Sequence, residues 1–135
     1  MTRGKFAIIT DEGMFTSYEF NGDMYNTKNG HGPEVIERLG RVNNKDDLVR
    51  EVEEFNANNF EYEGEFNKPY FIEGLPVSFR HETYFDKYFS DYVYVKNLCS
   101  ETKEIIDYDG KEVEIEPNQI LVFSFGHLET ENEED

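Results

Sequence analysis

Two short segments carry a glutamate at every second position, a spacing that brings carboxylates together on an extended strand. One segment is residues 60–66 and the other is residues 112–116, which two aspartates precede. Alternate residues of a strand share one face and lie roughly 6.7 Å apart. We predict that the protein binds its partner through the acids of both segments. These are Glu61, Glu63, Glu65, Asp107, Asp109, Glu112, Glu114 and Glu116.

The two glutamate ladders repeat single negative charges, as a nucleic-acid backbone does at ~3.4 Å per nucleotide along each strand. Such a ladder can compete with nucleic acid for a groove lined by Lys and Arg. Glu is a poor strand former and neighbouring like charges are destabilising, so each ladder costs stability. The pattern favours a non-enzymatic inhibitor that docks on the basic groove of a nucleic-acid-binding protein. The alternative is a solvent-facing strand whose charge serves only solubility.

Residues that suit catalysis are few and scattered. Removal of Met1 would leave Thr2 with a free amine beside its hydroxyl, the arrangement of an N-terminal nucleophile hydrolase. His31, His81 and His127 are about fifty residues apart and show no local ligand spacing, and a single cysteine gives no zinc cluster. We predict neither a metal nor another cofactor. A small hydrolase that uses Thr2 is the enzymatic alternative.

The composition excludes several classes of protein. The chain has 135 residues, of which 30 are acidic and 13 basic, and its formal net charge is −17. Phosphate contacts need Lys and Arg, and anionic lipids repel acids, so the chain should bind neither nucleic acid nor membranes directly. Cys99 is the only cysteine, which excludes a disulfide framework, and no apolar run approaches the ~20 residues of a membrane span. We expect a cytoplasmic protein with a reduced thiol.

The negative charge increases along the chain. Residues 1–45 carry no net charge, residues 46–90 carry −7 and residues 91–135 carry −10. A surface that is only solubilising does not need this gradient, whereas an acidic binding face produces one. Aromatic residues make up 16% of the chain, enough to build a core and to supply tyrosine anchors at an interface.

Hydrophobic periodicity predicts many short strands and few helices. The strands are predicted over residues 5–10, 14–20, 23–25, 60–66, 70–72, 92–98, 104–108, 111–116 and 119–125. The helices are predicted over residues 33–40, 44–57 and 81–90. Asn44 suits the N-cap of the second helix. The Asn21-Gly22 and Asp109-Gly110 pairs suit two-residue hairpin turns.

This order of elements predicts an α+β fold, a single domain with a mostly antiparallel sheet and two or three short helices. The domain should span residues 1–128. Residues 129–135 hold five acids and no apolar residue, and we expect an acidic disordered tail there.

The opening Thr2-Arg3-Gly4, followed by a hydrophobic strand, resembles the start of small uncharacterised proteins carried by phages and other mobile elements of low-GC bacteria. The resemblance covers about the first forty residues. It implies a phage-encoded protein in the cytoplasm of a host cell. Short acidic proteins of that kind are often inhibitors of host machinery, including restriction and CRISPR systems, so the resemblance implies an anti-defence role by analogy.

Overall fold

The computed structural model describes residues 2–64, 68–80 and 90–129, which contain two helices and ten strands. The helices are α1 (Gly32–Gly40) and α2 (Lys45–Asn59). The strands are β1 (Arg3–Thr10), β2 (Gly13–Thr16), β3 (Phe20–Asn21), β4 (Tyr70–Glu73), β5 (Val77–Ser78), β6 (Tyr92–Asn97), β7 (Lys103–Ile106), β8 (Glu112–Ile115), β9 (Ile120–Ser124) and β10 (His127–Leu128). Most strand pairs are antiparallel, which confirms the predicted α+β class.

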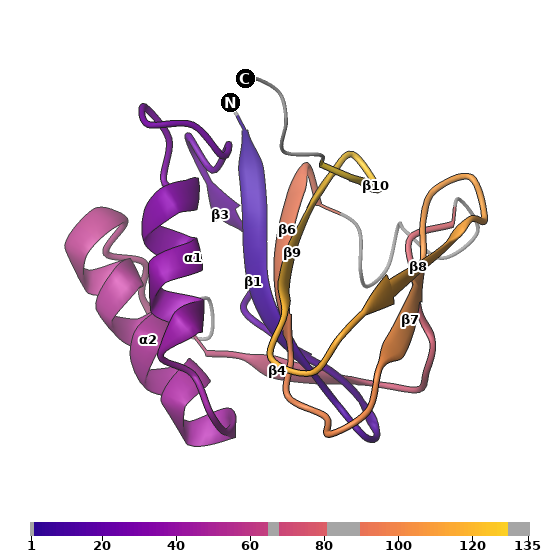
Figure 1. Cartoon of the computed structure of the whole chain (residues 1–135). Coiled ribbons are helices and arrows are strands. Elements are labelled where there is room, and N and C mark those ends of the chain that lie inside the picture. Colours follow the sequence, from indigo (N-terminus) through magenta and orange to yellow (C-terminus); the bar gives the residue numbers. More distant parts are fainter. Residues whose placement is uncertain (1, 65–67, 81–89, 130–135) are drawn as a thin grey trace.

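The strands form two sheets of different size. The large sheet has the order β10-β9-β6-β1-β2-β4, with β3 also paired to β1, and the small sheet has the order β5-β7-β8. Parallel pairing occurs only between β1 and β6 and between β5 and β7 in the described residues. Figure 1 shows α1 and α2 on one side of the large sheet and β7 and β8 on the other. The chain therefore folds into three layers, with the large sheet in the middle.

β1 lies at the centre of the large sheet and is buried on both faces. Phe6 and Ile8 pack toward the helices, whereas Ala7 and Ile9 pack toward the small sheet, and none of the four is exposed to solvent. A continuous apolar run is typical of a strand covered on both sides. This burial confirms the strand predicted over residues 5–10.

The first two predicted helices are present and cover one face of the large sheet (Figure 1). The Asn44 side chain accepts a hydrogen bond from the Asp47 N–H at 2.8 Å, which caps α2 as predicted. Leu48, Val52 and Phe55 are fully buried on the inner face of α2. Burial of this apolar face is the main term that holds the helix on the sheet.

An ion-pair network joins the two helices. The Arg38 guanidinium donates hydrogen bonds to Glu34 at 3.0 Å, to Glu51 at 2.9 Å and to Glu54 at 3.1 Å. Arg41 donates to Glu51 at 3.2 Å. Several of the acids therefore have an internal structural role and are not part of a free acidic surface.

The predicted strands over residues 14–20 and 23–25 need correction. The chain leaves the β2 ladder at Ser17, whose N–H donates to the Phe6 carbonyl at 2.9 Å, and β3 then pairs with β1. Residues 23–25 form no strand, and Asp23 has a φ of 57°, which a strand does not allow. The Asn21-Gly22 pair therefore does not close a hairpin.

The structure confirms three of the other predicted strands, whereas the third predicted helix and the tail lie almost entirely outside the described residues. The strands over residues 70–72, 92–98 and 119–125 are confirmed as β4, β6 and β9. The strands β5 and β10 have two residues each, too few for periodicity to reveal. The third predicted helix lies, except for Ser90, outside the described residues. The acidic tail also lies outside them, apart from Glu129.

Candidate functional site

The β7–β8 hairpin contains four of the eight predicted site residues, Asp107, Asp109, Glu112 and Glu114, and Glu116 directly follows β8. The turn of the hairpin is a five-residue loop, residues 107–111, and not the predicted two-residue turn. The Asp107 carboxylate closes this loop by accepting the N–H groups of Asp109 at 2.9 Å and Lys111 at 2.8 Å. Gly110 has a φ of 89°, in the left-handed region that favours glycine. The side chain of Asp107 thus shapes the turn, while Asp109 is exposed.

The longer loop sets the register that brings the carboxylates together. Glu104 lies opposite Glu114, and Ile106 lies opposite Glu112. These four residues define what we call the outer hairpin face, on which all three glutamates are exposed. The alternate residues pack toward the core: Ile105, Val113 and Ile115. The predicted alternation over residues 112–115 is therefore confirmed, and Glu104 is a residue that sequence reasoning missed.

The three carboxylates of the outer hairpin face form no ion pair within the described part of the chain. The neighbouring Lys103 is directed elsewhere, since its ammonium lies 3.9 Å from both Asp11 and Glu101. Glu104 and Glu114 are like charges at directly opposite positions, an arrangement that is destabilising in an antiparallel pair. The face therefore holds negative charge that no residue of the described ranges neutralises.

The described part of the first predicted ladder, residues 60–64, does not form a strand. Residues 61–63 are irregular, and Glu65 lies outside the described residues. Glu61 has a φ of 61°, incompatible with an extended chain. The Asn56 side chain on α2 pins the segment, because it accepts the Tyr62 N–H at 3.0 Å and donates to the Tyr62 carbonyl at 2.9 Å. Tertiary contacts with the helix thus override the alternating pattern.

The two ladders lie on different sides of the large sheet. Tyr62 packs against the helix-side core, whereas Val113 and Ile115 pack against the core beneath the small sheet. Glu61 and Glu63 therefore cannot belong to the same surface as Glu112 and Glu114. The predicted acids that the structure describes separate into two groups, and of these only Glu112 and Glu114 lie on a strand.

An exposed aromatic side chain lies beside the hairpin turn. Tyr108 is 37% exposed and its ring contacts the exposed ring of His127, and we call these two residues the turn patch. The Tyr108 N–H donates to the Gly126 carbonyl at 2.9 Å, which fastens the hairpin turn to the turn between β9 and β10. Phe125 and Leu128 are also exposed, at 55% and 36%, and the Phe125 ring contacts Tyr92 on β6.

His127 lies between two carboxylates at the same place. Its Nδ1 is 3.8 Å from Asp107 Oδ2 and 3.8 Å from Asp109 Oδ2, and its ring contacts the Tyr108 ring edge-on at 5.8 Å. These distances allow ion pairs when the imidazole is protonated. His127 is therefore the one histidine of the described chain that lies next to predicted site residues.

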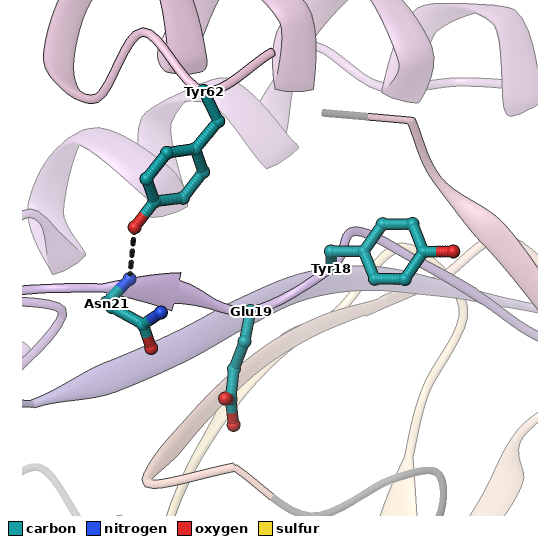
Figure 2. A pocket seen from close by; sticks show the side chains of 4 residues that line it. All are labelled: Tyr18, Glu19, Asn21 and Tyr62. Carbon is teal, nitrogen blue, oxygen red and sulfur yellow. Dashed lines mark hydrogen bonds between the residues drawn. The ribbon is translucent and has the colours of Figure 1, made fainter. Parts of the chain in front are cut away.

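A separate cavity of about 440 Å³ is lined by Tyr18, Glu19, Asn21 and Tyr62. Figure 2 shows that these side chains do not converge: the Tyr62 hydroxyl is directed at Asn21, whose N–H it accepts at 3.1 Å, while Tyr18 and Glu19 extend in other directions. The Glu19 carboxylate accepts the Ser90 hydroxyl at 2.8 Å. The four groups give no pair of acid and base facing a common point.

The described residues give the alternative catalytic residues no neighbouring acid, base or nucleophile with which they would form a catalytic pair. Thr2 uses its carbonyl to accept the Met24 N–H at 3.2 Å, and it does not line the cavity of Figure 2. His31 packs edge-on against Phe55, and His81 lies outside the described residues. Cys99 is buried, and burial foremost raises the pKa of its thiol to about 11.

Within the described ranges no group of three His, Cys, Asp or Glu side chains could hold a metal ion. In the same ranges no helix has the length and apolar character needed to cross a membrane.

Comparisons of this chain with protein-family models, with curated proteins and with solved structures find no match.

Proposed function

We propose that this chain is a non-enzymatic binding protein that docks its outer hairpin face on the cationic groove of a nucleic-acid-handling protein. The exposed carboxylates of Glu104, Glu112 and Glu114, which no described residue neutralises, are the observation that carries this proposal. By the resemblance of its first residues, the target would be a host defence protein of the restriction or CRISPR type, in the cytoplasm of an infected cell. The protein would act as an inhibitor that occupies the groove in place of nucleic acid.

Charge and apolar contacts have different roles in this proposal. The net charge of −17 gives long-range attraction to a cationic surface and fast, salt-sensitive association. The turn patch supplies short-range contacts, because exposed aromatic side chains are frequent anchors at interfaces. The hairpin places the carboxylates of the outer hairpin face and the turn patch at one end of the small sheet. A single groove can therefore contact the carboxylates and the turn patch together.

Affinity capture from host lysate, eluted with a salt gradient, tests the proposed function. We expect the wild-type protein to retain a basic protein that elutes as the salt concentration rises and that a short DNA or RNA duplex displaces. Capture of a protein that nucleic acid does not displace would contradict docking in a nucleic-acid groove, and so would binding that is equally tight in low and high salt.

A pair of matched variants locates the binding surface. The first variant carries Glu104→Gln, Glu112→Gln and Glu114→Gln. The control carries Glu12→Gln, Glu37→Gln and Glu53→Gln, which are exposed acids that form no ion pair with described residues. Both variants lose three negative charges. We expect the hairpin variant to lose the captured protein and the control to keep it, and equal loss in both would show that total charge alone determines binding.

A further inference from the structure

β8 forms one edge of the small sheet. Its only strand partner in the described ranges is β7, so its other edge is open there. Glu112 and Glu114 lie on this edge strand, and no described residue pairs with their carboxylates. An open edge presents unpaired N–H and C=O groups that can pair with another chain.

The hydrogen-bond pattern indicates which backbone groups face outward. The Phe79 N–H donates to the Ile106 carbonyl at 2.7 Å, so the backbone of Ile106 faces β5. The Asp107 N–H, one residue later, donates to the Lys111 carbonyl at 2.8 Å across the hairpin. Opposite residues in an antiparallel pair alternate between bonding to each other and pointing away. The peptide groups of Glu112 and Glu114 therefore point toward the open edge.

Glu116 is the next residue whose backbone would point toward the open edge, and its N–H already has a hydrogen-bond partner. The Glu116 N–H donates to the Gln119 side-chain oxygen at 2.8 Å, which ends the edge. Two residues with outward backbone groups remain, and both carry an exposed carboxylate. The edge thus offers hydrogen bonds and negative charge with the same two-residue period.

A shallow groove of about 490 Å³ adjoins this edge across the outer hairpin face. Its lining combines two apolar residues and two acids with one threonine and one lysine, whose ammonium lies near Asp11 and Glu101: Leu75, Pro76, Thr102, Lys103, Glu104 and Glu114. A long basic side chain can lay its alkyl stem on apolar surface and hold its charged end beside a carboxylate. The groove fits a lysine or arginine side chain that enters from the edge of β8 and reaches Glu114 and Glu104.

We infer that the open edge of β8 binds an extended basic segment of the partner as an added strand, with Lys or Arg at alternate positions. This inference rests on the proposed function and specifies how the outer hairpin face recognises its partner. Adjacent strands lie about 4.8 Å apart, so a cationic side chain directly opposite Glu114 comes within ion-pair distance of it. The added cation relieves the repulsion between Glu114 and Glu104, and backbone bonds to Glu112 and Glu114 fix the register.

Synthetic peptides test this inference on the full chain. The first probe is an eight-residue peptide that alternates Lys and Thr, and the second has the same composition with its four Lys in one block. A third probe repeats the alternating sequence with N-methyl groups along one edge, which removes backbone donors and keeps the charge. We expect the alternating peptide to bind about tenfold more tightly than either control, the effect of one or two hydrogen bonds. Slower hydrogen exchange at the amides of Glu112 and Glu114 should accompany binding.

A matched pair of protein variants separates charge from strand addition. Glu114→Gln removes the charge and keeps the outward N–H, whereas Glu114→Pro removes both, and proline is tolerated where an edge N–H faces solvent. We expect Glu114→Pro to weaken the alternating peptide about tenfold beyond Glu114→Gln, with circular dichroism confirming that both variants fold. If Glu114→Pro does not fold, the N-methylated peptide decides the question alone.

Two outcomes would overturn the inference and leave the proposed function standing. Equal binding of the alternating and N-methylated peptides would mean that charge alone attracts basic segments. Absence of peptide binding, together with salt-sensitive and groove-specific capture of a basic protein, would mean that the edge glutamates only protect β8 from strand pairing. Failure of the capture experiment would instead contradict the proposed function.

Discussion

Two kinds of buried charge stabilise or strain this fold at the level of single residues. The side chains of Arg38 and Glu51 are each 8% exposed and are paired with each other. Lys5 is 6% exposed and donates a hydrogen bond to the Tyr70 hydroxyl at 3.1 Å. The carboxylates of the outer hairpin face differ from both, because they are exposed and form no ion pair with the residues that the structure describes. This contrast distinguishes structural acids from acids that are free to bind a partner.

Replacement of Glu51 by Gln should destabilise the protein at neutral pH. Burial alone would raise the pKa of Glu51, but the hydrogen bonds from Arg41 and Arg38 outweigh burial and hold this pKa below its ordinary value. The ionised carboxylate therefore stabilises the fold above the ordinary Glu pKa of about 4.3, and this contribution is lost as the pH falls through the lower folded-state pKa. Arg38 keeps Glu34 and Glu54 as partners, so we expect Glu51→Gln to lower the free energy of unfolding at pH 7 by about 1.5–3 kcal/mol, the loss of hydrogen bonds to a charged group.

Urea unfolding at pH 7 and at pH 3 checks this prediction. The difference between wild type and Glu51→Gln should decrease at the lower pH. Glu53→Gln, a change at an exposed neighbour on the same helix, should have almost no effect at either pH. Equal destabilisation by both variants would mean that the ion-pair network between the two helices makes no specific contribution to the free energy of unfolding.

Lys5 should make stability increase with pH in the alkaline range. Burial lowers the pKa of Lys5 to about 8, and the nearby Glu19 opposes this shift only in part. The folded state therefore releases the proton near pH 8, while the unfolded state keeps it until about pH 10.4. We expect the free energy of unfolding to gain about 2 kcal/mol from this group between pH 7.5 and 9.5, and Lys5→Met to lack that gain. A pH slope that is identical in the two proteins would contradict the prediction.

At the level of elements, the Asp107 carboxylate determines the shape of the hairpin turn. It accepts two backbone N–H groups, so Asp107→Ala should leave two donors unsatisfied and lower the free energy of unfolding by about 1–3 kcal/mol. Asp109→Ala removes the same charge from a side chain that is 75% exposed and should cost much less. Hydrogen exchange at the Asp109 and Lys111 amides reports the turn directly. Equal protection in the two variants would show that the Asp107 carboxylate does not hold the loop.

The same turn shows how far the sequence predicts the site. The hairpin and the alternation of Glu112 and Glu114 follow from local pattern and are confirmed. The register does not follow, because a side-chain acceptor at Asp107 replaced the expected two-residue turn and moved Glu104 opposite Glu114. The local sequence pattern is sufficient to predict the hairpin, but it does not predict the strand register, which depends on the Asp107 carboxylate.

The segment after α2 shows that an alternating pattern can also predict a strand where the described residues form none. Residues 60–66 alternate as a strand should, yet the Asn56 side chain holds the described part of the segment against α2. Alternation predicts a strand only where another strand is available to pair with it. By contrast, β1 and both helices were predicted well, since each has a long apolar pattern that only one environment satisfies.

At the level of the whole molecule, the two predicted ladders lie on different sides of the large sheet. A docking groove can therefore contact the hairpin acids without contacting Glu61 and Glu63. Net charge draws a partner from a distance, but only carboxylates gathered on one face bind it at short range. The strength of binding to a cationic surface should therefore depend on where the carboxylates lie on the molecule, and not on the net charge alone.

Anion-exchange chromatography measures this distribution without a natural partner. The Glu104→Gln, Glu112→Gln and Glu114→Gln variant and the Glu12→Gln, Glu37→Gln and Glu53→Gln control have the same net charge, yet only the first loses the clustered carboxylates. We expect the hairpin variant to elute at clearly lower salt than the control, because the wild-type protein should bind the cationic matrix through its outer hairpin face. Co-elution of the two variants would mean that the acids act only as an evenly spread, solubilising charge.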